Sequence, residues 1–558
     1  MERNKPRLVQ FSAFGRRLSR LDTCWEWREM HRHSAANGLI ATAYTERKQY
    51  GRGARLLQFA KLHLFSPNSG MYSCPLAMTD GAAKLMEIVK DDPRQAELLR
   101  ATSKAVYDRL TSVDPDKFWT SGQWMTERGG GSDVSDGTRT VAVPIGGGYH
   151  ALSGFKWFSS ATDADVAVAL ARDRLQNGTR SKRLSCFMVK LPKGPVNDCS
   201  DAALRGLRAG DDSIQIARLK NKLGTRQLPT AELELKEAKA IRISPPGRGV
   251  RFVANLVNIT RLHNCVAATG LMAKATMLAQ DYSRKRKVFG KKLCELPLHL
   301  ETLASLRCLY SACLHITFRC ASLQGIVEAG ADHGGPHAAH LLRILTPVAK
   351  MYTAKCGVYV LTETMECIGG VGYMEDSGFP RMVRDGMVLP IWEGTTNVLA
   401  MDVIRVIQKT PDTLTHLTDD LRSMIRYRSS ETPSWAMRSA LCECLLKKIS
   451  QIDSMAKLLT VSKKALRWSR DFALLIAKTF CGAALLKQAE WSGEQLHRYI
   501  AEMYVLRNPQ DNGTAGLQAT DVMTKITEGI NNQSLMRALA LGENVATTLP
   551  STRLASKL

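Results

Sequence analysis

Apolar residues recur at helical spacing in the first hundred residues and again after residue 250. Between residues 25 and 105 they fall three or four positions apart, as in residues 56–62, which is typical of helices that bury one face. The same period returns over residues 250–407 and 410–545. The pattern therefore predicts a helical N-terminal domain, a helical bundle and an extra helical domain after it.

The middle of the chain follows a different pattern, of short runs that favour strands. Turns bound these runs, which are residues 140–144, 166–172, 185–189 and 231–235. The last run alternates strictly between apolar and charged residues, as a half-buried strand does. Residues 146–148 are all glycine and predict a hairpin turn. The predicted order is a weakly ordered arm (1–24), a helical N-terminal domain (25–121), a β domain (122–244), a helical bundle (245–408), an extra C-terminal helical domain (409–550) and a tail (551–558).

The 558 residues carry a formal net charge of +25. This excess could attract nucleic acid, favour an anionic ligand such as a phosphorylated cofactor, or reflect a basic compartment. Because the charge is spread along the chain, nucleic acid is the less favoured partner. The 14 cysteines include no CxxC pair, which predicts buried free thiols and no metal site. No apolar run reaches the ~20 residues of a membrane span.

The two ends of the chain predict different subcellular locations. Residues 1–21 hold six basic side chains and one acid, a composition found in mitochondrial transit peptides. The last three residues are Ser556, Lys557 and Leu558, a peroxisomal signal when it stands at an exposed C-terminus. A specific tripeptide at a fixed position is the more telling feature, so we expect the peroxisome, with the mitochondrion as the alternative.

One carboxylate, Glu393, stands between two apolar runs. Desolvation there would raise its pKa toward the range of a general base. Gly394 lets the backbone approach a ligand, and Thr395 and Asn397 can hydrogen-bond to it. The alternative is an ordinary helix start, with Glu393 in the first turn and Thr395 or Thr396 as its cap.

Three further stretches could bind a ligand, and each has a structural alternative. Residues 124–134 include three consecutive glycines before Ser132, so they form either an anion-binding turn or a plain loop. Residues 154–161 offer an aromatic pair beside two hydroxyls, which suits a flat ring or a core strand. Residues 284–292 are rich in cations. They could clamp a pyrophosphate or end a helix at Gly290.

In this order, the motifs resemble those of the flavin-dependent acyl-CoA dehydrogenases. The matching stretches are residues 126–134, 156–159, 286–291, 369–373 and 392–395. The resemblance covers about residues 40–407 and implies a helical N-terminal domain, a β-barrel middle domain and a helical bundle. Residues 219–226 and 368–377 are most similar to the AidB-type, alkylation-response branch, which carries an extra C-terminal helical domain.

The resemblance also implies roles for individual residues. Glu393 corresponds to the catalytic base of most members, while Thr260 occupies the position where a few members carry it instead. The substrate contacts would be Ser132, Arg261 and Gly394. Arg286 resembles the arginine that holds the FAD pyrophosphate of a neighbouring subunit. Val288 stands where many relatives have a hydroxyl, which puts one pyrophosphate contact in doubt. The implied FAD contacts are Met125, Thr126, Gly131, Ser132, Trp157, Phe158, Ser159, Arg286, Gly369, Gly370, Thr395 and Asn397.

The implied reaction is α,β-dehydrogenation of an acyl-CoA. Glu393 would remove the α-proton while the β-hydrogen leaves as hydride to FAD, giving a trans-2-enoyl-CoA. The resemblance also implies a homodimer or homotetramer that passes its electrons to an electron-transferring flavoprotein. If that protein is absent from the peroxisome, we expect dioxygen to be the oxidant. The alternative is a protein of AidB type that keeps FAD, binds acyl-CoA or nucleic acid and turns over little. The retained Glu393 favours the enzyme.

Overall fold

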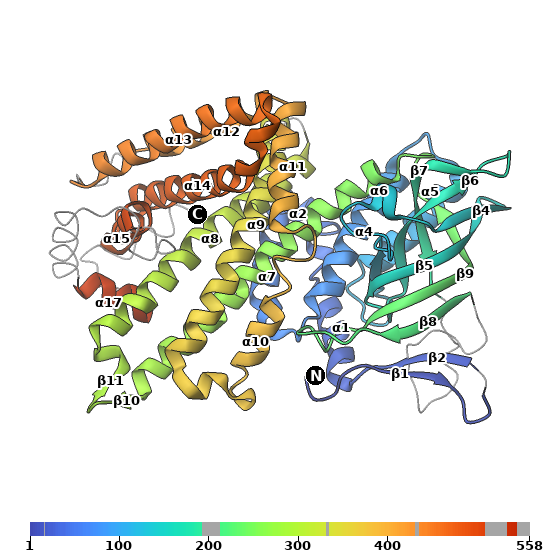
Figure 1. Ribbon diagram of the computed structural model, residues 1–558, viewed down its shortest axis with the longest axis horizontal. Helices are drawn as coiled ribbons and strands as arrows, with labels where there is room; N and C mark the ends of the chain where they lie inside the picture. Colours follow the sequence, from blue (N-terminus) through green and yellow to red (C-terminus); the bar gives the residue numbers. More distant parts are fainter. Residues whose placement is uncertain (16, 192–212, 331–333, 430–434, 508–532, 544–558) are drawn as a thin grey trace. The chain divides into compact units, whose positions relative to one another are not determined.

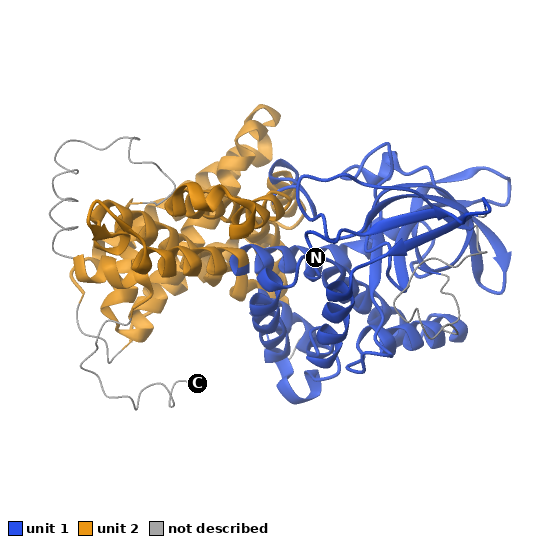
Figure 2. Cartoon of the chain, turned by 90° about the horizontal axis from the view of Figure 1, so that it is seen from below, with its two compact units in different colours: residues 1–270, 321–335, 390–398 blue, residues 271–320, 336–389, 399–558 orange. Residues whose placement is uncertain are grey.

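The computed structural model describes residues 1–15, 17–191, 213–330, 334–429, 435–507 and 533–543 (Figure 1). The predicted targeting tripeptide at Ser556 lies outside the described residues. The chain divides into two compact units (Figure 2). Unit 1 comprises residues 1–270, 321–335 and 390–398, and unit 2 comprises residues 271–320, 336–389 and 399–558. Each unit is therefore assembled from separated stretches of sequence.

Helices form the first part of unit 1, as the apolar period predicts. The main ones are α1 (Trp25–Ala36), α3 (Ala54–Phe65), α4 (Ser73–Asp91) and α5 (Glu97–Leu110). Helix α4 is the most deeply buried of them, with Leu76, Ala83 and Leu85 fully inaccessible. Its apolar face packs against α5, which removes both helices' apolar surface from water.

The N-terminal arm is not weakly ordered, so that prediction is wrong. It forms an antiparallel hairpin of β1 (Arg7–Phe11) and β2 (Arg17–Asp22). Leu8 pairs with Leu21, which is buried, and Leu8 packs against the core of the β domain. Gln10 donates a hydrogen bond to the Ala217 carbonyl. The many basic residues obscure the short alternation of apolar and polar positions in this arm. The hairpin is held in place by contacts with residues about 200 positions away.

The β domain is a closed ring of strands. Its strands are β3 (Ser121–Trp124), β4 (Val141–Gly146), β5 (Tyr149–Ser160), β6 (Val166–Arg174), β7 (Arg180–Lys190), β8 (Ile214–Leu219) and β9 (Thr230–Arg242). Strands β4, β5, β9, β7 and β6 pair in turn, and β6 pairs back with β4. Strand β3 adds parallel to β6, and β8 adds to β9. The predicted barrel and the hairpin turn at residues 146–149 are confirmed.

The interior of this ring is apolar and includes Trp124, Phe187 and Leu233, none of them accessible to water. Strand β9 departs from the strict alternation that its sequence predicts. Glu232 is buried, because it forms ion pairs with Arg218 and Lys220. Paired charges tolerate burial that a lone carboxylate would not.

Long helices follow the β domain. They are α7 (Gly249–Lys285), α8 (Pro297–Ala329), α9 (Gly335–Ile368), α10 (Phe379–Gly386) and α11 (Thr396–Lys409). Helix α7 ends at Lys285, so Gly290 is not its stop residue. A two-strand hairpin follows, β10 (Lys287–Val288) and β11 (Lys291–Lys292). Phe289 and Gly290 form its turn with φ of 48° and 77°, which is the left-handed backbone such turns need.

Unit 2 contains the extra C-terminal helices. They are α12 (Asp412–Arg426), α13 (Arg438–Val461), α14 (Ser469–Ser492), α15 (Gln495–Glu502) and α17 (Gln533–Leu541). Pro411 precedes α12 directly. Lys463–Ser492 is the one described segment with the length and composition of a membrane span, and 67% of its apolar window is buried. That burial is typical of a core helix.

Candidate active site

Glu393 has an unusual backbone. Its φ is 56°, in the left-handed region that non-glycine residues avoid, and Gly394 follows with φ of 104°. Helix α11 begins at Thr396, so Glu393 precedes the helix and does not lie in its first turn as the alternative interpretation had it. Left-handed backbone at a glutamate costs on the order of 1–3 kcal/mol and concentrates at functional sites. The backbone of Glu393 therefore differs from that of a residue at an ordinary helix start.

Residues of helix α7 form hydrogen bonds to both the side chain and the backbone of Glu393. The Thr260 hydroxyl donates a 2.7 Å hydrogen bond to Oε2 of the carboxylate. The Arg261 Nε donates to the Glu393 backbone carbonyl at 3.3 Å. Thr260 is buried, and Glu393 is only partly accessible. Two consecutive residues of α7 therefore position the carboxylate. The sequence analysis names Thr260 and Arg261 as separate candidates. No local pattern predicts that they contact a residue more than 130 positions away.

An apolar patch lies within electrostatic range of the carboxylate. Cys74 of α4 packs against a buried cluster of Met78, Ala161 and Ala164. Burial raises the pKa of Cys74 to about 12, a shift that the Lys222 ammonium opposes and the Glu393 carboxylate reinforces. The thiol is therefore neutral at pH 7. It adds apolar surface within electrostatic range of Glu393, which is the environment an acyl chain requires.

The predicted ligand-binding loop after β3 is assembled around Thr126. Trp157 donates its backbone N–H to the Thr126 carbonyl at 2.9 Å. Gly131 lies against the Thr126 side chain, where an added Cβ would be 3.0 Å from the hydroxyl oxygen. Met125 is buried and Ser132 is exposed. The structure thus brings residues 125–132 beside β5, as the resemblance implies.

A buried ion pair that the sequence did not predict fixes this loop. Lys156 and Glu127 are both buried, and their charged atoms are 2.7 Å apart. Glu127 also accepts hydrogen bonds from the backbone N–H groups of Arg139 and Thr140. Burial alone would raise the pKa of Glu127, but the Lys156 ammonium holds it below its usual value. Glu127 is thus a structural anchor and not a candidate base.

The three side chains at the end of β5 have different exposures. Phe158 is 53% exposed and Trp157 is partly buried, which argues against a core aromatic strand. The Lys220 ammonium lies 3.2 Å from the centre of the Trp157 ring. Ser159 is fully buried, and within the described part of the chain its hydroxyl finds no hydrogen-bond partner. A buried polar atom of this kind is costly unless a ligand satisfies it.

Three predicted cofactor residues belong to unit 2. Arg286 is exposed directly after α7. Gly369 and Gly370 are exposed at the start of a 3₁₀ helix, Gly369–Tyr373, where Gly369 has φ of 71°. Thr395 and Asn397 lie in unit 1 and are exposed. The predicted site residues are therefore divided between the two compact units.

A buried network of charged side chains contacts the turn of α7 that contains Thr260. The guanidinium of Arg55 donates to both oxygens of Asp80, at 2.8 and 2.9 Å, and to both oxygens of Glu328, at 2.7 and 2.9 Å. His263 forms a 2.8 Å hydrogen bond with Asp80. Because His263 comes three residues after Thr260, it lies on the same side of α7. The network thus ties the helix turn that holds Glu393 to α3, α4 and α8.

Comparison with known proteins decides the family. The acyl-CoA dehydrogenase middle domain matches residues 122–238, and the C-terminal domain of the same family matches residues 247–408. The N-terminal domain of the adaptive response protein AidB matches residues 1–109. The chain is 40% identical to acyl-CoA dehydrogenase family member 11 of Caenorhabditis elegans over 519 residues, which are 90% of this chain and 80% of that protein. The chain belongs to the acyl-CoA dehydrogenase family.

Other relatives agree with this assignment. The putative acyl-CoA dehydrogenase AidB of Escherichia coli is 30% identical over 73% of this chain and 70% of its own length. The crystal structure of C. elegans ACDH-11 in complex with C11-CoA superposes with a TM-score of 0.82, at 38% identity over 95% of this chain and 87% of that one. An acyl-CoA dehydrogenase of Bacillus anthracis complexed with FAD shares the fold at 17% identity and a TM-score of 0.66. The predicted family and AidB-type branch are confirmed.

Proposed function

We propose that this acyl-CoA dehydrogenase family enzyme oxidises an acyl-CoA thioester to the trans-2-enoyl-CoA, with FAD as cofactor and Glu393 as base. The observation that carries the proposal is the strained backbone of Glu393, which Thr260 and Arg261 hold within electrostatic range of the Cys74 patch. A carboxylate whose side chain and backbone are both fixed by hydrogen bonds is positioned as a general base must be, and left-handed backbone of this kind concentrates at functional sites. The C11-CoA in the C. elegans relative supports an acyl-CoA as substrate.

The residues of unit 1 fit a flavin. The buried hydroxyl of Ser159 lacks a partner among the described residues, so an acceptor or donor on a ring edge would satisfy it. Trp157 and Phe158 offer aromatic faces next to it, and the turn at Gly131 offers backbone N–H groups. FAD, when bound, supplies the acceptor for the hydride that leaves the β-carbon.

The work left to the protein is proton removal and exclusion of water. Thr260 fixes one oxygen of the Glu393 carboxylate, which limits the directions from which the carboxylate can meet a substrate. An acyl chain packed on Cys74 and Met78 would displace water from the same space, and a desolvated carboxylate is a stronger base. Glu393 then takes the α-proton as the β-hydrogen leaves with its electron pair, and the α,β double bond forms.

An anaerobic titration tests this proposal. The purified protein is expected to show a flavin absorption band that bleaches on addition of an acyl-CoA of the preferred chain length, with trans-2-enoyl-CoA as the product. A band that persists while acyl-CoA binds saturably would instead support the alternative, a binding protein of AidB type with little turnover. Absence of the flavin band would rule out the cofactor.

The oxidant and the location are further parts of the proposal. The C-terminal Ser556, Lys557 and Leu558 suggest import into the peroxisome, where dioxygen would reoxidise the flavin in place of an electron-transferring flavoprotein. The anaerobically reduced protein should then regain its absorption within seconds of mixing with air-saturated buffer. Slow reoxidation would favour a protein acceptor. We also expect a homodimer or homotetramer, since the family resemblance assigns Arg286 to the cofactor of a neighbouring subunit.

Replacement of Ser159 with alanine should separate flavin binding from stability. The change removes a buried hydroxyl that has no partner among the described residues, so the flavin-free protein should unfold no more easily than wild type. FAD affinity should fall by about tenfold, the value of one hydrogen bond. The matched control is Ser160→Ala, because the Ser160 hydroxyl already pairs with Thr230 at 3.0 Å. Equal FAD affinity in Ser159→Ala and wild type would contradict the assignment.

A further inference from the structure

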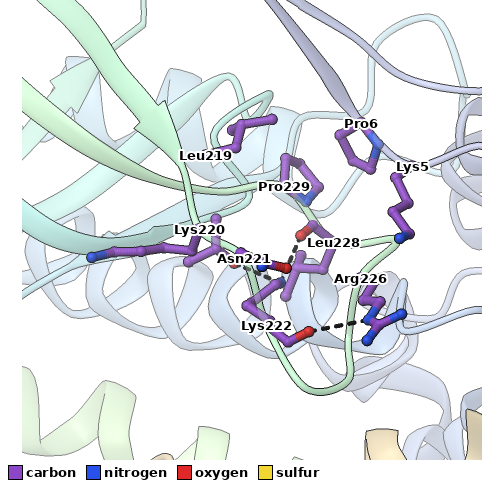
Figure 3. A pocket seen from close by; sticks show the side chains of 10 residues that line it. Lys5, Pro6, Leu219, Lys220, Asn221, Lys222, Arg226, Leu228 and Pro229 are labelled. Carbon is purple, nitrogen blue, oxygen red and sulfur yellow. Dashed lines mark hydrogen bonds between the residues drawn. The ribbon is translucent and has the colours of Figure 1, made fainter.

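Unit 1 contains a cationic pocket that the proposed reaction does not use (Figure 3). Its walls come from the segment between β8 and β9 and from Lys5 near the N-terminus. The empty volume within it, including the part open to solvent, is about 380 Å³. Four cationic side chains line the pocket, Lys5, Lys220, Lys222 and Arg226, and none of its lining residues in the described part of the chain is a carboxylate. A site this size and of this charge suits a small anion.

Hydrogen bonds fix the conformation of the loop after β8, whose residues Lys222 and Arg226 line the pocket. The Lys222 ammonium donates to the Leu228 carbonyl at 2.8 Å and to the Thr230 hydroxyl at 3.0 Å. Arg226 donates from Nε to the Lys222 carbonyl at 3.1 Å. Thr225 has φ of 52°, which lets the chain reverse between these contacts. In Figure 3, Arg226 is drawn below Lys5 and Pro6, while the Lys220 side chain extends away from them.

Lys5 and Pro6, directly before the N-terminal hairpin, also line the pocket. Gln10 donates to the Ala217 carbonyl at 2.8 Å, and Arg17 donates to the Ile216 carbonyl at 3.1 Å. Both acceptors lie on β8, directly before the pocket loop. The hairpin is thereby fixed on the β domain, which brings Lys5 to the pocket. Lys5, one of the basic residues of the N-terminus, is thus part of a folded surface.

The charge of the pocket is only partly compensated. Glu232 accepts from Lys220 at 2.6 Å and also from Arg218. Among the residues that the structure describes, neither Lys5 nor the terminal nitrogens of Arg226 form an ion pair. Asn221 and Thr230 add polar groups to the wall. The pocket is thus lined by residues that carry ammonium, guanidinium, amide and hydroxyl groups, which are the donors that phosphate oxygens prefer.

We propose that this pocket binds the phosphate or pyrophosphate group of a small phosphorylated molecule. The family resemblance assigns the FAD pyrophosphate to Arg286 and to other residues outside this loop, so the pocket serves a different phosphate. Two sources share the chemistry. One is the nucleotide portion of the acyl-CoA substrate, an identification that rests on the proposed function. The other is a separate phosphorylated ligand.

The test measures binding of inorganic pyrophosphate to the flavin-loaded, full-length protein by calorimetry. Binding is expected to weaken as salt is raised, because the attraction is between charges. Lys5→Ala and Arg226→Ala should each weaken it by about tenfold, as expected for loss of one charge-assisted hydrogen bond. The matched control, Lys48→Ala, removes an exposed lysine of the same unit and should change the affinity by less than about twofold, since it contributes no group to the pocket. Lys5 precedes β1, so its variant keeps the test valid if Arg226→Ala fails to fold.

Competition then identifies the source. If CoA displaces pyrophosphate and both variants weaken CoA binding without affecting an N-acetylcysteamine thioester, the pocket holds a phosphate of the substrate. If CoA and pyrophosphate bind together, the pocket serves a separate phosphorylated ligand. Either result supports the site, whereas wild-type protein that fails to bind pyrophosphate, or variants that bind it equally well, would overturn it. Since no flavin bleaching is measured, failure of the proposed reaction leaves this test unaffected.

Discussion

Replacing Glu393 with glutamine should abolish flavin bleaching by acyl-CoA while leaving the flavin bound. Glutamine has the same shape and still accepts the hydrogen bond that Thr260 donates to Glu393, so the loop should keep its conformation. An amide cannot take the α-proton, and loss of a positioned base lowers the rate by about 10²–10⁴-fold. Stopped-flow measurement of the anaerobic reduction gives the rate, and acyl-CoA affinity should change little because the thioester contacts remain.

The chain offers a close control for that substitution. Glu237 is also a glutamate with left-handed backbone, at φ of 57°, but it is exposed on β9. Glu237→Gln should reduce flavin at the wild-type rate. If Glu393→Gln keeps more than about a tenth of the wild-type rate, then the base lies elsewhere, because base catalysis contributes at least about 10²-fold.

Periodicity and motif order together are enough to predict the fold class and the family. Helical spacing predicts the helices of both units, and the glycines at residues 146–148 predict the hairpin between β4 and β5. The motif around Glu393 singles out that carboxylate through its immediate neighbours in the chain. These signals are local, since each is contained in a short stretch of sequence, and local patterns determine secondary structure and short motifs directly.

What the sequence could not predict depends on contacts between distant residues. Thr260 and Glu393 meet although they are 133 positions apart. The burial of Lys156 follows from its ion pair with Glu127, and a lysine at that position would ordinarily be expected at the surface. The N-terminal hairpin is held by backbone carbonyls of β8. In each case, the partner is selected by the packed fold and leaves no pattern in the local sequence.

Replacing Arg55 with methionine should destabilise unit 1 more than any other single change considered. Arg55 is buried between Asp80 and Glu328, whose side chains are 0% and 2% exposed. Methionine would leave two buried carboxylates without their main cation. Removal of one partner from a buried ion pair costs about 3–5 kcal/mol. Urea unfolding at pH 7 measures the loss, and Arg52→Met, at an exposed position of the same unit, should cost less than about 0.5 kcal/mol.

The pH dependence distinguishes lost charge pairing from lost packing. Burial opposes ionisation of Asp80 and Glu328, but Arg55 outweighs it and holds the pKa of each below its usual value. Such groups stabilise the wild type above the unfolded pKa, about 4, and this contribution is lost as the pH falls further. Without Arg55, burial is expected to raise the pKa values of Asp80 and Glu328. As the pH falls, both carboxylates therefore become protonated in the variant at a higher pH than in the wild type, which removes the cost of the unpaired buried charges. The stability gap between wild type and Arg55→Met should therefore be widest near pH 7 and narrow towards pH 4. A gap that is independent of pH would mean that Arg55 acts through packing alone.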